Sequence, residues 1–419
     1  MTTYDQTWVE AEEAKRQWMA DNGMYKHDDE HASCGVGLVV AIDGTPSRGV
    51  VEKGINALKA VWHRGAVDAD GKTGDGAGIH VQIPVPFFED QIRRTGHEPK
   101  TDKMIAVGQV FLPRADFGAQ ERCRTIVESE VLRMGYYIYG WRHVPVNVSC
   151  LGEKANTTRP EIEQLLVSNS KGVDEETFER ELYVIRRRIE KAAQAAGIHG
   201  LYLASLSCRS IIYKGMFLAE DMSEFYPDLK DERFESAFAL YHQRYSTNTF
   251  PQWWLAQPFR MLAHNGEINT LKGNTNWMTS HEIRMSSDAF GDMADDIKPV
   301  IPSGSSDSAA LDAVFEMLVR AGRNAPMAKT MLVPESWSKQ AVDLPKSWRD
   351  MYSYCNSVME PWDGPAALAM TDGRWVCAGL DRNGLRPMRY VVTGDGLLIA
   401  GSEAGMVTVD EANVKEKGA

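Results

Sequence analysis

The sequence lacks any hydrophobic segment long enough to cross a membrane. Its 419 residues contain no apolar run approaching the about 20 residues that a spanning helix needs. Residues 1–33 also lack the apolar centre of a secretory signal, because they are mostly polar and acidic. The sequence therefore predicts a cytoplasmic protein with no membrane partner.

Closely spaced cysteines are missing as well. None of the six lies near enough to another to form the pairs that mark zinc, iron-sulfur or redox sites. Such scattered cysteines are typical of a reducing compartment, and we expect no metal site in this chain. The six are Cys34, Cys123, Cys150, Cys208, Cys355 and Cys377.

Positive charge is in short supply. The 46 lysines and arginines face 58 acidic residues, which gives a formal net charge of -12. General nucleic-acid binding depends on neutralising phosphates with lysine and arginine, so we expect no nucleic-acid partner. Trp253, Trp254 and Trp277 could stack on bases, but in so acidic a chain we expect them to pack in the core or in loops.

Repeats and low-complexity segments are also absent, and the pattern of the chain predicts a mixed α+β protein. Strands in pairs and helices in blocks favour this class over regular alternation of strand and helix. The expected strands lie near residues 79–85, 105–112, 136–144, 201–206 and 210–213. The expected helices lie near residues 86–95, 116–134 and 174–196.

The segment around Cys34 has the pattern of a maturation junction. A short helix ending near Asn22 and an acidic tail precede Cys34, and an apolar, β-branched run at 35–42 follows it. If Cys34 became the first residue, its α-amine, with a pKa of about 7.7 to 8.0, could accept the thiol proton. The alternative is that Cys34 is a small buried hydrophobe at the start of a strand.

Polar residues crowd into several later segments where a core would need apolar ones. Each of them also has an ordinary explanation. Arg244 could form a surface ion pair, Asn265-Gly266 a tight turn, and Asp307 a helix N-cap. The segments are residues 241–251, 256–260, 264–270, 305–308 and 381–387.

Together these motifs resemble the class II glutamine amidotransferases, whose nucleophile is N-terminal (Ntn). Residues 34–37 resemble the mature N-terminus of that family. The glutamine-site motifs of the family are matched, in the same order, by residues 244–247, 264–266 and 306–308. The similarity covers almost the whole chain. Four further stretches resemble a subgroup, the amidotransferase domains of glutamate synthase large subunits: residues 248–251, 256–260, 273–277 and 381–387.

The resemblance implies a fold and a domain division. The fold is an Ntn-hydrolase sandwich of four layers, αββα, in which two antiparallel sheets stack between helices. Residues 1–33 would be a propeptide removed on maturation, and residues 34–419 the amidotransferase domain of a longer chain. Cys34 would then emerge at the end of its strand, in the active site.

The resemblance also implies roles for seven residues. Cys34 would attack the glutamine side-chain amide, while the Asn265 amide and the Gly266 N–H would form the oxyanion hole. The remaining four would serve the substrate. Arg244 would bind its α-carboxylate and Asp307 its α-ammonium, Thr247 would contact the glutamine, and Arg64 would lie close to the Cys34 terminus.

The implied reaction is hydrolysis of L-glutamine to L-glutamate and ammonia through a Cys34 thioester. In the resembled enzymes the ammonia travels to 2-oxoglutarate in synthase domains that are not in this sequence. Those domains use FMN and a [3Fe-4S] cluster with electrons from NADPH or ferredoxin, so we expect no cofactor in this segment. The expected partners are the remaining glutamate synthase domains and, as a further candidate, a small electron-donating subunit.

Two alternatives stay open. A class II amidotransferase feeding a sugar phosphate or a phosphoribosyl acceptor would share the catalytic motifs but should lack the four subgroup stretches. A non-catalytic glutamine-binding module would keep residues 1–33, and Cys34 would then have no free α-amine.

Overall fold

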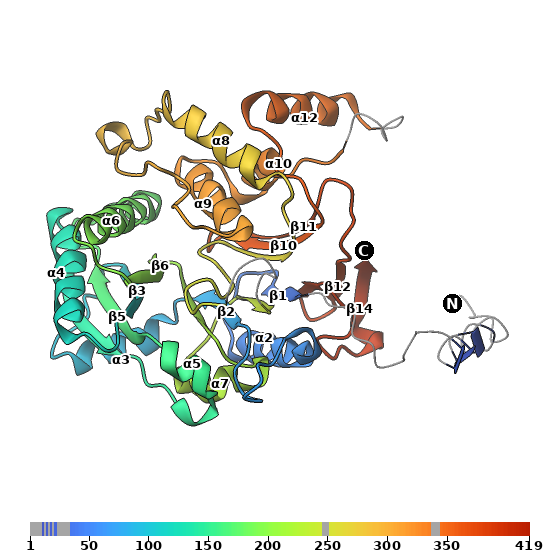
Figure 1. The fold of residues 1–419 in the computed structure, drawn as a ribbon, viewed down its shortest axis with the longest axis horizontal. Helices are drawn as coiled ribbons and strands as arrows, with labels where there is room; N and C mark the ends of the chain where they lie inside the picture. The colour runs from blue at the N-terminus through green and yellow to red at the C-terminus, as the bar shows by residue number, and fades with distance from the viewer. Residues whose placement is uncertain are drawn as a thin grey trace. The chain divides into compact units, whose positions relative to one another are not determined.

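The structure is a computed structural model, shown in Figure 1. It describes residues 34–244, 251–336 and 344–419, together with Ala11, Ala14, Lys15, Gln17, Trp18, Asp21 and Asn22. The chain divides into two compact units, Met1–Ser33 and Cys34–Ala419. The described residues of the first unit are helical, in agreement with the predicted short helix, whereas the predicted acidic tail lies outside the described residues.

The second unit is built around a seven-stranded sheet in which every pairing is antiparallel. The apolar run after Cys34 forms its middle strand, as predicted, and most of that run is buried. In spatial order the strands are β14 (Val414–Gly418), β12 (Arg389–Thr393), β13 (Leu397–Gly401), β1 (Gly35–Ala41), β8 (Phe238–Gln243), β2 (Ala77–Gln82) and β7 (Ser210–Gly215).

Two smaller sheets complete the set, and both are also antiparallel. One has the order β11 (Val376–Leu380), β10 (Ala366–Thr371), β9 (Leu262–Gly266). The other has the order β4 (Tyr137–His143), β5 (Glu161–Ser168), β3 (Ile105–Leu112), β6 (Tyr202–Ser207).

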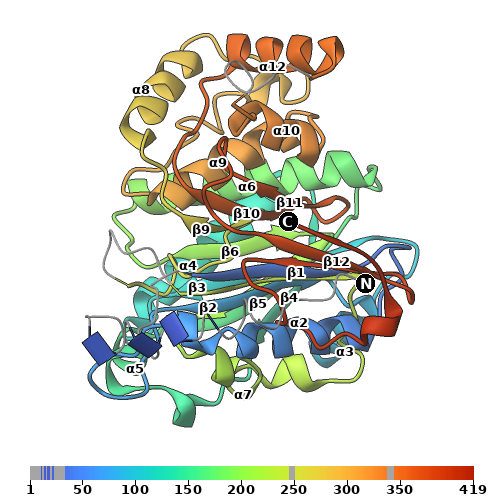
Figure 2. The ribbon, with the colours of Figure 1, turned by 90° about the vertical axis from the view of Figure 1, so that its right-hand side faces the viewer.

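Stacking of the seven-stranded sheet on the three-stranded sheet produces the expected sandwich. The two sheets meet through small and apolar side chains that allow a close approach: Val36, Leu38, Leu240, Ala263, Ala367 and Ala369. Helix α2 (Arg48–Ala60) covers the outer face of the large sheet, and α9 (Asp307–Arg320) and α10 (Ala325–Leu332) cover the small one. Figure 2 shows this order from α2 at the bottom to α10 near the top, so the αββα prediction is confirmed.

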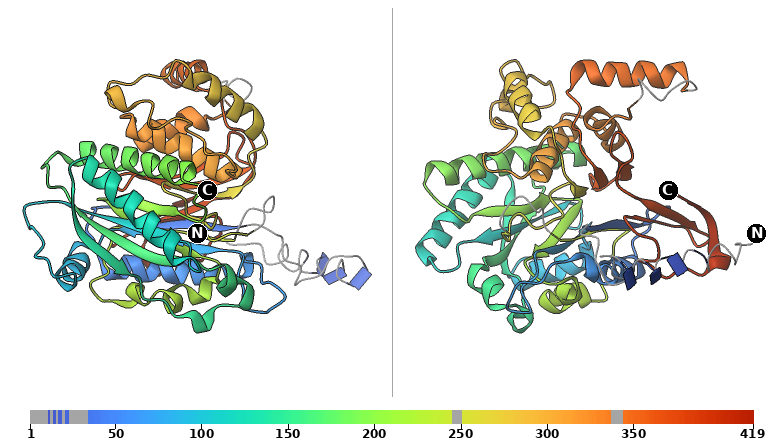
Figure 3. Two further views of the ribbon diagram at one scale, coloured as in Figure 1. Left: turned by 60° about the vertical axis from the view of Figure 1, so that its left-hand side comes forward. Right: turned by 45° about the vertical axis from the view of Figure 1, so that its right-hand side comes forward.

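The four-stranded sheet has helices of its own. Helices α4 (Phe117–Arg133) and α6 (Glu175–Ala195) pack side by side against it, as the teal and green ribbons of Figure 3 show. The remaining helices are α3 (Val85–Arg94), α5 (Glu153–Thr158), α7 (Met222–Phe225), α8 (Leu271–Glu282) and α12 (Lys346–Val358).

The strands and helices predicted between residues 79 and 213 are present in the structure. The strand 105–112 and the helix 174–196 match β3 and α6 within one residue. Strand β5 was not predicted, and its sequence places two glutamates and a glutamine among apolar residues. Partly buried arginines from other elements meet two of these residues, since Arg124 pairs with Glu163 and Arg142 donates to Gln164.

The tryptophan prediction is partly wrong. Trp253 is buried and Trp254 partly so, as expected, but Trp277 projects from α8 with 55% of its surface exposed. Helix α8 is mostly polar, so its sequence does not indicate which of its sides packs against the rest of the protein. In the described ranges, no helix has the length and hydrophobicity needed to cross a membrane.

Candidate active site

Cys34 lies where the central strand begins. In the antiparallel register Gly35 is opposite Gln243, the last residue of β8, so the chain leaving β8 passes beside Cys34. The cysteine is partly exposed and its thiol is free. The start of a strand in the middle of the sheet thus presents a nucleophilic side chain to its neighbours.

Arg244 has an unusual backbone at this position. Its φ is 88°, and no other non-glycine residue described in the structure has a positive φ. Its N–H donates to the Gly76 carbonyl at 2.8 Å, and its guanidinium Nε lies 3.6 Å from an oxygen of Asp75. Such a conformation costs about 1 to 3 kcal/mol and persists only where the surroundings impose it. Arg244 is therefore held in place, in an ion pair beside the start of β1.

Asn265 and Gly266 end strand β9 and do not form a tight turn. The Asn265 side-chain Nδ2 donates to the Cys34 carbonyl at 2.7 Å, which ties the two residues directly together. Gly266 has a φ of 149°, and a Cβ there would lie 1.8 Å from the Pro365 oxygen. Only glycine fits at this position, so the backbone comes close to its neighbours without a side chain between.

Asp307 is the first residue of α9, and Ser306, rather than Asp307, is the N-cap. The Ser306 hydroxyl accepts from the Ala309 N–H, which leaves the Asp307 carboxylate free for another contact. That carboxylate is buried and accepts from the Ile268 N–H at 2.9 Å, just past the end of β9. The helix start is thereby fixed against the strand that carries Asn265.

The electrostatic surroundings of the Cys34 thiol combine these residues. Burial is the largest influence and raises the pKa of the thiol to about 11. The positive charges of Arg244 and Arg386 lower this pKa, whereas the negative charges of Asp75 and Asp307 raise it. The thiol therefore needs a base before it can act as a nucleophile near neutral pH.

The residue before Asn265 carries a buried imidazole, one of whose nitrogens contacts a serine. His264 Nδ1 lies 2.7 Å from the Ser308 hydroxyl, and burial lowers the pKa of the ring. The backbone of His264 is clamped by the Gln257 side chain, which accepts from its N–H at 2.7 Å. Within the described ranges, the structure records no hydrogen bond from a histidine to the Cys34 thiol.

Arg386 is the residue that sequence reasoning missed at this site. Its loop is folded around the Asp381 carboxylate, which accepts the N–H groups of Leu385, Arg386 and also Ala366. Ala366 pairs with Gly266 across β9 and β10, so the loop is anchored to the end of the site strand. In the sequence, the motif 381–387 was only one of the stretches that resemble the subgroup. The electrostatic influence of Arg386 on Cys34 is visible only in the folded structure.

Arg64 lies near the start of β1, through its partner Glu403. It ends the short 3₁₀ helix Trp62–Arg64 and forms an ion pair with Glu403, which His63 also contacts at 3.1 Å. Glu403 follows Ser402, whose N–H donates to Val36 at 2.9 Å, so this pair borders the start of β1. Thr247, the remaining predicted site residue, lies outside the described residues.

Over the ranges that the structure covers, no three His, Cys, Asp or Glu side chains come together in a way that could hold a metal ion. The chemical groups around Cys34 are its own thiol, the guanidinium groups of Arg244 and Arg386, the amide of Asn265, and the carboxylates of Asp75 and Asp307.

Comparison with known proteins identifies similar sequences over nearly the whole chain. The family model described as "Glutamine amidotransferases class-II" matches residues 34–419, so the match begins at Cys34. The "Glutamate synthase [NADPH] large chain" of Azospirillum brasilense is 67% identical over 394 residues, 94% of this chain and 26% of that protein. The protein of the same name from Bacillus subtilis is 42% identical, over 94% of this chain and 26% of its own length.

A plant relative shows the same pattern. "Ferredoxin-dependent glutamate synthase 1, chloroplastic/mitochondrial" of Arabidopsis thaliana is 43% identical, over 93% of this chain and 24% of its own length. The chain therefore spans about a quarter of the length of these relatives.

Proposed function

This chain belongs to the class-II glutamine amidotransferases, and on that premise we propose that it hydrolyses L-glutamine to L-glutamate and ammonia through a thioester on Cys34. One observation carries the proposal. The first residue matched by the family is a cysteine at the start of the central strand, and the Asn265 amide lies 2.7 Å from its carbonyl.

In the proposed reaction the Cys34 sulfur attacks the side-chain carbonyl carbon of glutamine. The oxygen of the tetrahedral intermediate accepts from Asn265 Nδ2 and the Gly266 N–H, which end the same strand. The amide nitrogen takes a proton and leaves as ammonia, which gives the thioester. Water then attacks the thioester, releasing glutamate and the free thiol.

The proposed base is the α-amine of Cys34 itself. Burial raises the pKa of the thiol, and no histidine among the described residues is recorded in a hydrogen bond to it. An α-amine titrates at about 7.7 to 8.0 and would lie on the same residue as the nucleophile. This mechanism requires that residues 1–33 are removed as a propeptide, which would place Cys34 at the N-terminus.

The substrate would be held by its α-amino-acid group. We assign its carboxylate to Arg244, whose guanidinium can grip it with two parallel hydrogen bonds, and its ammonium to Asp307. Both charges influence the pKa of the Cys34 thiol, and they come from different elements, the residue after β8 and the start of α9. Thr247 is proposed to contact the glutamine, and Arg64 with Glu403 to border the Cys34 terminus.

The wider role follows from the relatives. We propose that the chain is the amidotransferase part of a glutamate synthase and that its ammonia is channelled to 2-oxoglutarate in synthase domains beyond this sequence. FMN, a [3Fe-4S] cluster and the contact with an electron donor would belong to those domains. The six free cysteines fit a cytoplasmic location.

The intact mass of the purified chain, expressed from Met1, tests the maturation step. We expect the mass of residues 34–419, together with glutamate release from glutamine. A stable full-length mass accompanied by glutamine binding without turnover would contradict the proposal and favour a binding module that keeps its N-terminal segment.

A further inference from the structure

Helices α8 and α12 expose an unusual concentration of large apolar side chains. Six such residues lie on or directly after these two helices, and we call them the α8–α12 surface: Trp277, Ile283, Trp348, Met351, Tyr354 and Val358. Both helices lie at the same end of the second unit in Figures 1 and 2. Monomeric proteins rarely leave large apolar groups together in water without a functional reason.

Helix α12 shows the anomaly most clearly. Its sequence is amphipathic, with Trp348, Met351, Cys355 and Val358 recurring at helical spacing. Only Cys355 among its 13 residues is buried. A surface helix normally buries its apolar stripe, so most of the stripe of α12 is unused within this unit.

A groove adjoins this surface. It has a volume of about 470 Å³ and runs between α8, α9, α10 and the end of α12. Five methionines line it, and methionine adapts its shape to many apolar partners: Met278, Met285, Met317, Met331 and Met359. Arg284 and Arg323 also line the groove, so it combines apolar depth with positive charge.

We propose that the α8–α12 surface and this groove are the face against which the rest of the longer polypeptide packs. This inference rests on the proposed function, in which the chain is one part of a glutamate synthase. The relatives are about four times as long as the segment they share with this chain, so the proposed full-length protein would carry a much larger tethered part that could occupy this surface. Aromatic residues, methionine and arginine are the types enriched in protein interfaces.

A second copy of the chain is a less suitable occupant. Each copy carries a formal net charge of -12, so two copies repel each other at long range. A segment of the same polypeptide is present at a high effective concentration, typically in the millimolar range for short linkers, and needs no such encounter. The occupant we infer is therefore an apolar segment with acidic residues at its edges, located in the missing part of the chain.

Hydroxyl-radical footprinting of the full-length polypeptide tests this assignment. Trp348 and Trp375 are each 53% exposed here, but Trp375 lies in the turn between β10 and β11 and is not part of the α8–α12 surface. We expect Trp348 to be oxidised at least fivefold more slowly than Trp375. Equal oxidation of the two would overturn the assignment. Protection of Trp348 that appears only as protein concentration rises would assign the surface to a second copy instead.

A matched pair of variants supplies an independent readout. In the full-length protein, Trp348→Glu combined with Met351→Glu should leave glutamine hydrolysis intact but release several-fold more free ammonia per glutamate formed. Trp375→Glu should behave like the unmutated protein. Equal coupling in all three proteins would overturn the inference, whereas an unmutated protein that hydrolyses no glutamine would contradict the proposed function instead.

Discussion

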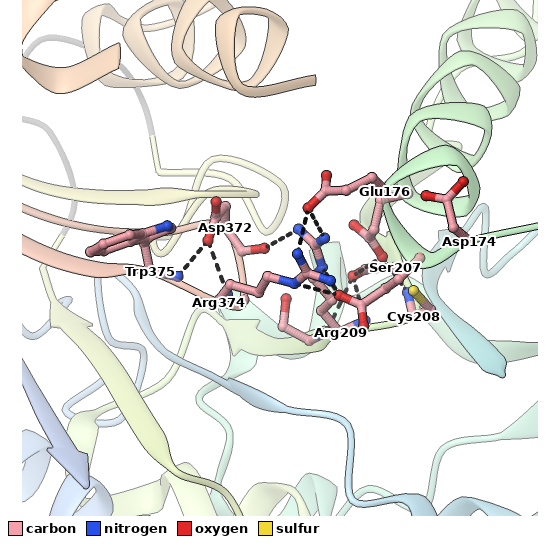
Figure 4. Close-up of polar contacts among 12 residues, drawn as sticks. Asp174, Glu176, Ser207, Cys208, Arg209, Asp372, Arg374 and Trp375 are labelled. Atoms are coloured by element: carbon pink, nitrogen blue, oxygen red, sulfur yellow. Dashed lines mark hydrogen bonds and ion pairs between the residues drawn. The ribbon is translucent and has the colours of Figure 1, made fainter. Parts of the chain in front are cut away.

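Two polar regions of this chain, similar in composition, are organised in opposite ways. One is the Cys34 site. The other, which we call the Arg209 cluster, joins the start of α6, the turn between β6 and β7 and the turn between β10 and β11 (Figure 4). Its members are Arg209, Arg374, Glu175, Glu176 and Asp372.

In the Arg209 cluster the buried charge is fully engaged. The Arg209 side chain is only 4% exposed, and its three nitrogens donate to Glu175, Glu176 and the Asp372 carbonyl. Arg374 binds the same two glutamates from the other side at 2.9 and 3.0 Å. These contacts link three elements that are distant in the sequence, which is a structural role.

Around Cys34 several buried polar atoms lack a hydrogen-bond partner among the described residues. Sixteen buried side-chain atoms have no hydrogen-bond partner within the part of the chain that the structure describes. Six of these sixteen belong to residues on the strands and the loop next to Cys34: His242, Gln243, His264, Asn265 and Arg386. Since buried polar groups are normally paired, such a concentration indicates a region arranged to meet a polar ligand. Hydrogen-bond pairing thus distinguishes Arg209, whose three side-chain nitrogens all have partners, from the region around Cys34, where several buried polar atoms have none.

The largest expected effect is the loss of the nucleophile. Cys34→Ala should abolish glutamine hydrolysis, because no thioester can form, and should leave the melting temperature within about 2 °C of the original. The matched control is Cys123→Ala. Cys123 is fully buried, so this change should lower stability and keep activity. If Cys34→Ala retained activity, or behaved like Cys123→Ala, Cys34 would be an ordinary buried hydrophobe.

The next effect is the loss of the oxyanion donor. Asn265→Ala should lower kcat by about 10² to 10³ with little change in KM, because the donor acts on charge that develops in the transition state. Asn274→Ala is the control, since Asn274 is also buried but donates to the Pro361 carbonyl at 3.1 Å. It should reduce stability without lowering kcat. Similar kinetics for the two variants would remove the assigned role of Asn265.

A smaller effect, on stability alone, is expected in the Arg209 cluster. Arg209→Ala should lower the free energy of unfolding by about 1.5 to 3 kcal/mol, because buried charged hydrogen bonds are lost. Arg374→Ala should cost less than about 1 kcal/mol, because that side chain is 51% exposed. Urea unfolding measures both changes, and kcat per folded molecule should stay constant. A large drop in kcat for Arg209→Ala would mean that the cluster takes part in the reaction.

The smallest effect concerns the charge of Arg386. Its positive charge lowers the pKa of the Cys34 thiol, so Arg386→Gln should raise that pKa and shift the pH profile of Cys34 alkylation to higher pH. Below the thiol pKa the alkylation rate should therefore fall. Arg386→Lys keeps the charge and should restore most of the original profile. Superimposable profiles for all three proteins would show that Arg386 does not act on the thiol.

The sequence by itself determined the main local features of this protein. The alternation and length of apolar runs located strands such as β3 and long helices such as α6. The motif order predicted that Cys34, Arg244, Asn265, Gly266 and Asp307 belong to one site. Local patterns suffice for these features because strand and helix periodicity, and a motif's residue types, are written in consecutive positions.

Tertiary structure alone decided the features that depend on distant partners. The charged strand β5 forms because Arg124 and Arg142 satisfy its polar residues from other elements. Arg386 joins the Cys34 site because Asp381 folds its loop onto the strand paired with β9. The exposed stripe of α12 is visible only once the packing of the other helices is known. Pairing and burial join residues far apart in sequence, and no local pattern specifies which side chains will meet.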